Sequence, residues 1–141
     1  MVYDHHYIER CKVLGRQAAE KGNPEVGAII VKENIIISEA EEAAVSKNDI
    51  TCHAEMETLR LAIKKIGTNN LAGCILYSTH EPCIMCAYAI RFYRIEKVVY
   101  LNKVKYLGSV SSSMALLTTS EVPPHWGSAP VIVHVSNECA D

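Results

Sequence analysis

Residues 74–101, CILYSTHEPCIMCAYAIRFYRIEKVVYL, contain the pattern that decides the fold. Residues 74–78 form an apolar run typical of a strand, residues 83–94 have the spacing of a helix, and residues 97–101 predict a second strand. A strand, a helix and a strand at this spacing form a right-handed crossover between two parallel strands. This stretch therefore predicts an α/β protein.

The sequence on either side predicts further helices and strands. Residues 26–31 and 34–38 are β-branched runs separated by Lys32-Glu33, which is short enough for a hairpin. Helices are predicted over residues 6–21, from Ala54 to a stop at Gly67, and around Val110, Met114 and Leu117 before Pro123-Pro124, and a last strand is predicted over residues 131–135. We therefore expect one α/β domain, residues 1–141, with helices on both faces of a mixed sheet.

Length, charge and cysteine content limit the class of protein. The 141 residues are 49% apolar, which is enough for one core, and the net charge of -2 supplies no field to attract a polyanion such as RNA. The six cysteines are expected to be reduced, with some of them binding metal and with Cys11, Cys52 and Cys74 packed in the interior. No apolar stretch has the length to cross a bilayer, and the start has no basic segment followed by an apolar run. We expect a soluble, cytoplasmic protein.

Pro82, Cys83 and Cys86 open a helix directly after the strand at residues 74–78. Ligands of such sheets bind beyond the carboxyl ends of the parallel strands, so the dithiol is expected at the functional edge. Proline suits a helix start, and the free N–H groups there stabilise thiolates. The pair is half of a zinc site, a redox dithiol or two buried thiols, and its spacing alone does not separate zinc from redox chemistry.

The stretch His53-Ala54-Glu55 favours zinc. It also opens a predicted helix, and the far end of that helix leads to the strand that carries the cysteines, so both helix starts are expected at one sheet edge. His53, Cys83 and Cys86 supply three ligands for a tetrahedral ion and leave the fourth position for water, as in a catalytic zinc site. A redox dithiol needs no such histidine.

H-x-E followed by P-C-x-x-C is the signature of zinc deaminases. With NPEVGAIIV (residues 23–31), HAEM (53–56) and EPCIMCAYAI (81–90), the chain resembles the cytidine and deoxycytidylate deaminase superfamily from about Asn23 to Leu101. The branch is that of bacterial tRNA adenosine deaminases, guanine deaminases and fungal cytosine deaminase. The resemblance implies a three-layer α/β/α fold with a five-stranded mixed sheet. It also implies one zinc per chain held by His53, Cys83 and Cys86, and Glu55 as the proton shuttle.

A substrate pocket beside the zinc site follows from the same resemblance. Its candidate residues are the backbone N–H of Ala54, the start of the strand at 26–31, Asn23, Pro82 and Glu42. At the position of Glu42, tRNA adenosine deaminases and many guanine deaminases carry an asparagine that contacts substrate, so we expect Glu42 to influence substrate choice. The alternative is that EAEEAA is a solvated acidic loop in which Glu42 points outward. His80 lies close enough to the predicted site to contact substrate. Residues 102–109 leave the carboxyl end of a strand and are expected at the pocket mouth, with Lys103, Lys105 and Tyr106 among them.

The expected reaction is hydrolytic: an amino group on a ring carbon is replaced by a carbonyl oxygen and leaves as ammonia. A free nucleobase or nucleoside is the first expected substrate, because the net charge is negative and because Arg91, Arg94 and Lys97 form only a small basic cluster. A tRNA adenosine deaminase is the alternative enzyme, an inactive zinc-binding subunit is the alternative from another class, and a redox protein comes last. Family members usually continue into a final helix, whereas this chain ends at SNECAD, so we expect a short helix or cover from a partner, and a homodimer.

Overall fold

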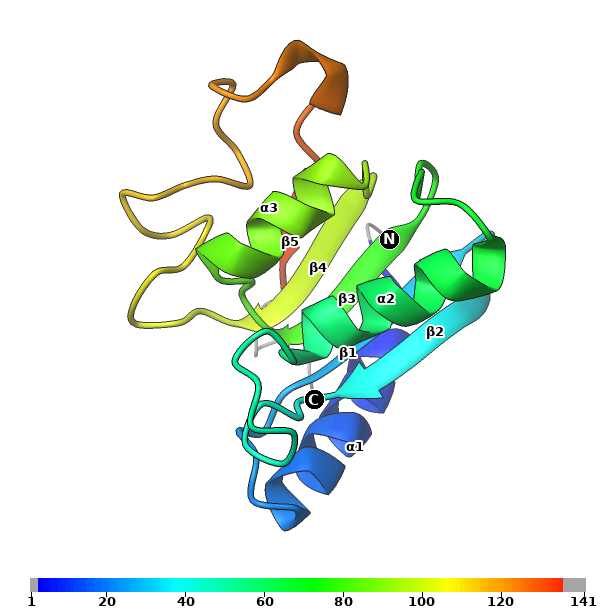
Figure 1. The fold of residues 1–141 in the computed structure, drawn as a ribbon, viewed down its shortest axis with the longest axis vertical. Helices are drawn as coiled ribbons and strands as arrows, with labels where there is room; N and C mark the ends of the chain where they lie inside the picture. The colour runs from blue at the N-terminus through cyan, green and yellow to red at the C-terminus, as the bar shows by residue number, and fades with distance from the viewer. Residues whose placement is uncertain (1–2, 136–141) are drawn as a thin grey trace.

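The computed structural model describes residues 3–135 and contains a five-stranded mixed sheet with helices on both faces (Figure 1). In chain order its elements are α1 (His5–Glu20), β1 (Gly27–Lys32), β2 (Ile35–Glu41), α2 (Ala54–Ile66), β3 (Ile75–His80), α3 (Ile84–Phe92), β4 (Lys97–Asn102), the 3-10 helix η1 (Pro124–Trp126) and β5 (Val131–His134). The strand order is β2-β1-β3-β4-β5, with β1 antiparallel to both neighbours and β3, β4 and β5 parallel. The expected α/β/α class and the β3-α3-β4 crossover are confirmed.

The sheet divides the interior into two apolar layers. Figure 1 shows α1 on one face and α2 and α3 on the other. Along β1, Ala28 and Ile30 belong to the layer with α2 and α3, whereas Ile29 and Val31 belong to the layer with α1. Successive side chains of a strand point to opposite faces, so a strand covered on both sides reads as a continuous apolar run. This arrangement explains why GAIIV contains no polar residue.

The ends of the helices follow local sequence signals. The Asp4 side chain caps α1 by accepting a hydrogen bond from the backbone N–H of His6. Helix α2 stops at Gly67, whose left-handed φ of 84° closes the last turn on the carbonyl of Ile63. Among residues 3–135, no helix combines the length and apolar character needed to span a bilayer.

The predicted hairpin is confirmed, and its turn lies one residue later than expected. Glu33 and Asn34 both have positive φ, 51° and 61°, in the two positions between β1 and β2. This backbone matches the type of two-residue turn whose twist suits a hairpin. Asn tolerates the left-handed region well, and the carbonyl of Asn34 also accepts a hydrogen bond from the Tyr7 hydroxyl.

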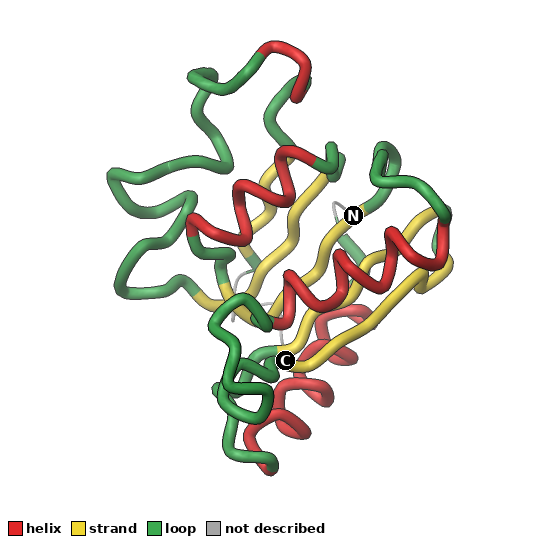
Figure 2. The backbone as a smooth tube through the Cα atoms, in the orientation of Figure 1, coloured by secondary structure: helices red, strands yellow, loops and turns green. Residues whose placement is uncertain are grey.

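The helix predicted around residues 110–117 is wrong. Figure 2 shows a long loop between β4 and η1 in its place. The buried guanidinium of Arg91 donates hydrogen bonds to the carbonyls of Leu116 (2.9 Å) and Thr119 (2.8 Å). These carbonyls are therefore bound by a side chain from α3. The segment is organised by contacts distant in sequence, which periodicity does not reveal.

Helices α2 and α3 begin at the sheet edge where the parallel strands end. Their N-cap residues are His53 and Cys83, and the last residue of β3, His80, pairs with Asn102 of β4 at the same edge. Trp126 packs at the other edge, beside the residues that precede β4. The stretch SNECAD, including Cys139, lies outside the described residues.

Candidate active site

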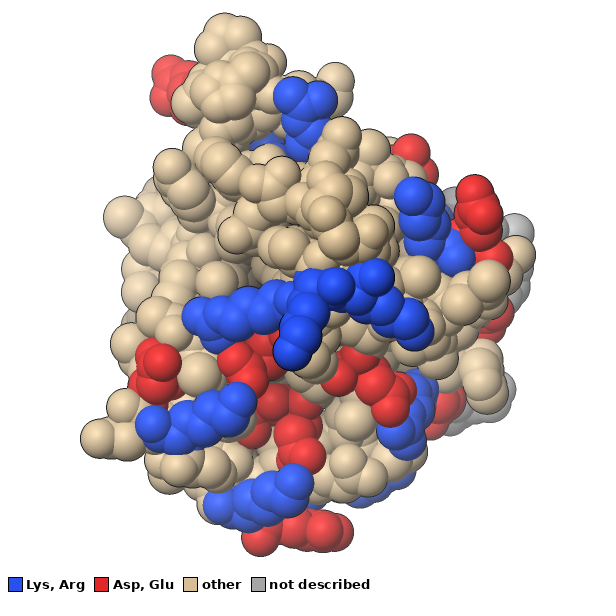
Figure 3. Space-filling model, turned by 45° about the vertical axis from the view of Figure 1, so that its right-hand side comes forward, with Lys and Arg blue, Asp and Glu red and all other residues tan. Residues whose placement is uncertain are grey.

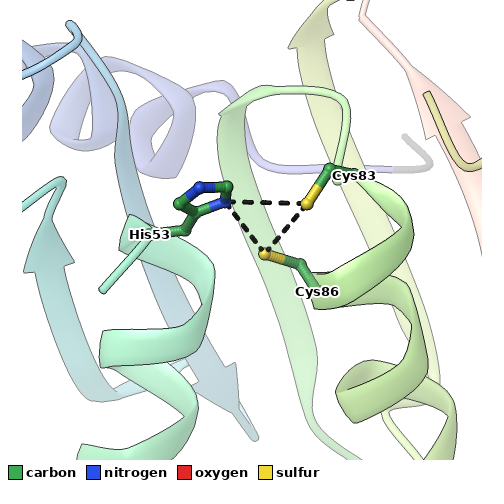
Figure 4. A group of neighbouring side chains, drawn as sticks. All are labelled: His53, Cys83 and Cys86. Atoms are coloured by element: carbon green, nitrogen blue, oxygen red, sulfur yellow. Dashed lines mark hydrogen bonds between the residues drawn. The ribbon is translucent and has the colours of Figure 1, made fainter. Parts of the chain in front are cut away.

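The side chains of His53, Cys83 and Cys86 come together at the starts of α2 and α3 (Figure 4). The Nδ1 atom of His53 lies 3.6 Å from the Sγ atom of Cys83 and 3.6 Å from that of Cys86, and the two Sγ atoms are 3.7 Å apart. Cys83 is the N-cap of α3 and Cys86 lies in its first turn, so both sulfur atoms face the start of α2.

These separations fit a tetrahedral zinc ion. Zinc–sulfur bonds of about 2.3 Å and zinc–nitrogen bonds of about 2.0–2.1 Å at tetrahedral angles require sulfur atoms about 3.8 Å apart and nitrogen about 3.6 Å from sulfur. The observed distances match both values. The three residues present therefore suit zinc and leave its fourth coordination position free.

His53, Cys83 and Cys86 share protons that a bound metal ion would displace. The hydrogen bond between Cys83 and Cys86, followed by contact with His53, lowers the pKa of the Cys83 thiol to about 4, against the opposing effect of burial. The hydrogen bond to Cys83 raises the pKa of His53 to about 9, and the bond to Cys83 together with burial raises the pKa of Cys86. Sulfur and nitrogen atoms that share protons at these distances exchange them for a metal ion, so metal binding here releases protons.

Glu55 lies next to this group, in the first turn of α2. It is buried and lines a cavity of about 210 Å³ together with His53 and Cys83. Burial raises the pKa of Glu55 to about 8, so the carboxyl group can take up and release a proton near neutral pH. Pockets for drug-sized ligands measure roughly 300–1,000 Å³, so the smaller cavity suits a single ring system.

Glu42 follows β2 and also lines this cavity. Its side chain is buried, and its Oε1 atom accepts a hydrogen bond of 3.2 Å from the backbone N–H of Ala54. Burial raises the pKa of the Glu42 carboxyl group. Ala54 itself is fully buried, and the N–H expected at the pocket border is therefore bonded to Glu42.

The other side of the cavity is formed by His80, Val104 and Tyr106, with Pro24 and Val26 of the segment leading into β1. Burial lowers the pKa of His80, which keeps its imidazole neutral near pH 7, and its Nδ1 atom lies 3.0 Å from the hydroxyl of Thr79. Tyr106 is 75% exposed. Of the loop residues expected at the pocket mouth, Tyr106 lines the cavity, whereas Lys103 and Lys105 are not among its lining residues.

Asn23 and Pro82 are not brought to the cavity wall. The Oδ1 atom of Asn23 accepts hydrogen bonds of 3.0 Å from the backbone N–H groups of Val45 and Ser46, so its amide fastens the loop after β2. Pro82 is buried, and its carbonyl accepts a hydrogen bond of 3.0 Å from the N–H of Ser109. Both residues support segments next to the cavity because their polar groups are used within the protein.

Glu81 is a buried residue of the cavity wall that the sequence reasoning missed. It stands between β3 and the first candidate ligand of α3, and its carboxylate is surrounded by donors from the loop after β4. The available signal was a carboxylate between a buried strand and a helix start, because a carboxylate buried there needs hydrogen-bond partners.

Comparison with known sequences agrees with this geometry. A family model described as the cytidine and deoxycytidylate deaminase zinc-binding region matches residues 1–102. A tRNA-specific adenosine deaminase of Aquifex aeolicus is 47% identical over 102 residues, which are 72% of this chain and 68% of that protein. A guanine deaminase of Bacillus subtilis is 38% identical over 95 residues, 67% of this chain and 61% of that protein.

Solved structures give the same relationship. A structure from a study of A-to-I editing by tRNA:A34 deaminases superimposes with a TM-score of 0.83 at 32% identity, covering 93% of this chain and 98% of the other. The guanine deaminase of Bacillus subtilis superimposes with a TM-score of 0.71 at 28% identity, covering 97% and 88%. The chain belongs to the cytidine and deoxycytidylate deaminase family and is a zinc-dependent hydrolytic deaminase with one zinc ion per chain.

Proposed function

We propose that this enzyme deaminates an adenosine presented by tRNA. The observation that carries the proposal is the 47% identity over 102 residues to a tRNA-specific adenosine deaminase, supported by the TM-score of 0.83 to the structure from the tRNA:A34 deaminase study. The comparisons favour this substrate over the free nucleobase or nucleoside that we expected first. The zinc site and the cavity are compatible with either.

The residues of the cavity have complementary tasks in this proposal. His53, Cys83 and Cys86 hold zinc, which when bound supplies a water activated near neutral pH. Glu55 takes a proton from that water and passes it to the ring nitrogen next to the amino-bearing carbon, which makes this carbon electrophilic. The remaining hydroxide adds to this carbon, Glu55 moves the hydroxyl proton to the amine, and the C–N bond breaks, so that ammonia leaves and a carbonyl remains.

The pocket mouth offers groups that suit a nucleotide flipped out of its stack. Tyr106 is exposed and lines the cavity, and the Nζ atom of Lys105 lies 5.4 Å from the centre of its ring. Lys103 on the same loop is also exposed. Aromatic rings stack on unpaired bases and lysines contact phosphates, which is how proteins hold single-stranded RNA.

The face turned to the viewer in Figure 3 is a poorer RNA surface. Acidic side chains gather there, and lysine and arginine side chains border them. Glutamates of β2 and α2 are paired with basic side chains in Arg10–Glu39, Lys21–Glu41, Lys47–Glu57 and Arg60–Glu57. Paired charges leave little field to attract phosphate. Arg91, expected in a surface basic cluster, is buried and does not contribute to such a surface.

Inosine formation tests the proposal. The zinc-loaded enzyme is incubated with an anticodon stem-loop RNA carrying one loop adenosine, and separately with adenine, adenosine, guanine and cytosine, while ammonia and inosine are measured. We expect the highest kcat/KM for the RNA, with binding that weakens as salt rises. Turnover of a free base with no change in the RNA would refute the tRNA substrate. The Glu55→Gln variant controls for contaminating deaminases.

Deamination of a free aminopurine such as guanine is the second candidate, and Glu42 is the observation that favours it. An ionised carboxylate only accepts hydrogen bonds, whereas asparagine both donates and accepts. Guanine presents a ring N–H and an amino group side by side, so a buried acceptor suits its edge better than that of adenine. A base that turns an edge without donors toward this carboxylate loses about 1–3 kcal/mol of binding free energy.

The Glu42→Asn and Glu42→Gln variants separate the two candidates in the same panel. If Glu42 selects the base, both changes alter the ratio of kcat/KM between guanine and adenosine about tenfold or more. An unchanged ratio for every substrate would show that Glu42 does not contribute to selectivity.

We also propose that residues 1–141 form one catalytic domain and that two copies associate through the outer face of α2 and α3. An apolar groove of about 810 Å³ runs along this face, lined by Met56, Ile84, Met85, Tyr88, Ala89, Phe92, Tyr93 and Leu116. None of these side chains carries a full charge, and Tyr88 is 55% exposed. An exposed apolar patch of this kind marks an interaction surface, and a symmetric pair buries it with one contact.

A further inference from the structure

The carboxylate of Glu81 is buried, with 2% of the residue exposed, and it accepts four hydrogen bonds from one loop. Its Oε1 atom accepts from the N–H of Val104 (3.2 Å) and the hydroxyl of Ser111 (2.7 Å). Its Oε2 atom accepts from the N–H groups of Val110 (2.9 Å) and Ser111 (2.8 Å). All donors come from the loop that leaves β4.

This carboxylate is held by hydrogen bonds to neutral groups. Its partners are the N–H groups of Val104, Val110 and Ser111 and the Ser111 hydroxyl, each of which donates to the carboxylate. Hydrogen bonds to an ionised acceptor are shorter and stronger than those between neutral groups. The Glu81 carboxylate is thus a strong acceptor that holds the loop at a single point.

The loop is also shaped to fit around the carboxylate. A Cβ atom added at Gly108 would lie 2.6 Å from Cδ of Glu81 and 2.8 Å from its Oε1, closer than real Cβ contacts. The φ of Gly108 is not positive, so space rather than backbone conformation calls for glycine here. Leu107 adopts a φ of 58°, an uncommon value for leucine. Gly108 forms an isolated β-bridge with Cys83, and Figure 1 shows the loop after β4 passing beside the start of α3.

Glu81 therefore connects two parts of the cavity. Along the chain it is two residues from Cys83, and through its hydrogen bonds it holds the loop that contributes Val104 and Tyr106 to the wall. We propose that Glu81 is a positioning residue of the deaminase pocket, which fixes residues 103–111 against the start of α3 so that Val104 and Tyr106 complete the cavity around Glu55. This inference rests on the assignment of that cavity as the substrate pocket.

Glu81→Gln tests the proposal with little change of shape. Glutamine keeps one acceptor oxygen but turns an amino group toward donors, so up to half of the hydrogen bonds to the loop are lost. With the wall loosened and His53, Cys83 and Cys86 still held by α2 and α3, KM should rise about tenfold, while kcat stays within about twofold and zinc remains at one per chain. The substrate is whichever compound of the panel above the wild-type enzyme converts fastest. Glu96→Gln, an exposed glutamate before β4, is the matched control.

Amide hydrogen exchange of the zinc-loaded enzyme provides a readout that needs no substrate. The N–H groups of Val104, Val110 and Ser111 should exchange at least about tenfold faster in Glu81→Gln, while amides inside α2 and α3 keep their protection. If a wrong substrate assignment is the only error, this exchange pattern still appears. The exchange measurement therefore tests the role of Glu81 independently of the proposed substrate.

Two further variants keep the test decisive if Glu81→Gln folds poorly. Ser111→Ala removes one of the four donors and should raise KM about threefold, and Gly108→Ala displaces the loop with the carboxylate intact and should raise KM about as much as Glu81→Gln. Because both changes act on one contact, the effects of Gly108→Ala and Glu81→Gln should not add. The proposal would be overturned if the variants lost zinc and kcat fell with it. It would also be overturned if KM and amide hydrogen exchange were unchanged in all three variants.

Discussion

His53 and Cys83 occupy the N-cap positions of α2 and α3, and neither side chain makes a capping hydrogen bond. Serine, threonine, aspartate and asparagine are preferred at this position because they accept from the first free N–H groups. Both helices forgo that stabilisation, and their side chains point to a common centre instead. The positive ends of the helix dipoles stabilise thiolate there, so the same positions that weaken the helix starts favour metal binding.

At the residue scale, loss of the thiols should remove zinc. We expect the Cys83→Ser, Cys86→Ser double variant to bind less than about one tenth of the zinc of the wild type, because hydroxyl groups do not replace thiolate ligands. Elemental analysis of the purified protein gives the ratio of zinc to chain. Cys52→Ala, a buried thiol outside the candidate ligand group, is the control and should keep one zinc per chain. Full zinc content in the double variant would contradict the ligand assignment.

Glu55→Gln should separate chemistry from metal binding. The amide occupies nearly the same space but carries no proton between water, ring and amine, so kcat should fall by about 10²–10⁴-fold. Zinc content and the thermal unfolding midpoint should stay close to those of the wild type, because Glu55 is not among the three candidate ligands. Wild-type turnover in this variant would show that another group moves the protons.

At the scale of the elements, Arg10 of α1 and Glu39 of β2 form a two-point contact, with Nε to Oε2 at 2.9 Å and a second bond at 2.6 Å. Arg10 lowers the pKa of Glu39 below its ordinary value of 4.5, against the opposing effect of burial. The pKa of Glu39 is lower in the folded than in the unfolded protein. The contact therefore stabilises the folded state fully above about pH 4.5, and this stabilisation is lost as pH falls through the folded pKa.

Glu39→Gln should therefore lower the free energy of unfolding by about 0.5–1 kcal/mol at pH 7, a modest value because the pair is about one-third exposed. The difference from wild type should shrink between pH 5 and pH 3. Urea unfolding at a series of pH values measures it, with Glu20→Gln on the exposed side of α1 as the control. A difference that grows on acidification would contradict the sign of the shift.

Elements with regular periodicity could be predicted from the sequence, whereas the loop after β4 could not. The apolar runs of β1, β3 and β4 and the helix starts at His53 and Cys83 carry local signals, so the metal group was predictable. The fold of residues 103–123 depends on Arg91 and Glu81, which reach it from α3 and from the end of β3. Side-chain contacts to backbone across such distances leave no repeat in the sequence. The same reason explains Asn23, whose amide is used by a loop more than twenty residues later.

At the scale of the whole molecule, the groove on α2 and α3 should control association. Tyr88→Lys places a charge in the centre of the apolar lining and should convert a dimer to a monomer at micromolar concentration, as measured by light scattering after size-exclusion chromatography. Tyr3→Lys, on the layer of α1, is the control and should leave the mass unchanged. A wild-type chain that is monomeric throughout would contradict the proposed pairing.

The position of Trp126 decides what can be seen by fluorescence. It is the single tryptophan of the chain, and its buried ring packs edge-on against Tyr88 at 4.6 Å and Phe92 at 5.9 Å between ring centres. Both partners line the groove, while the zinc and substrate groups lie at the opposite sheet edge. Intrinsic emission therefore acts as a built-in probe of whether a neighbour covers α3, and a titration with metal or substrate leaves the emission spectrum nearly unchanged.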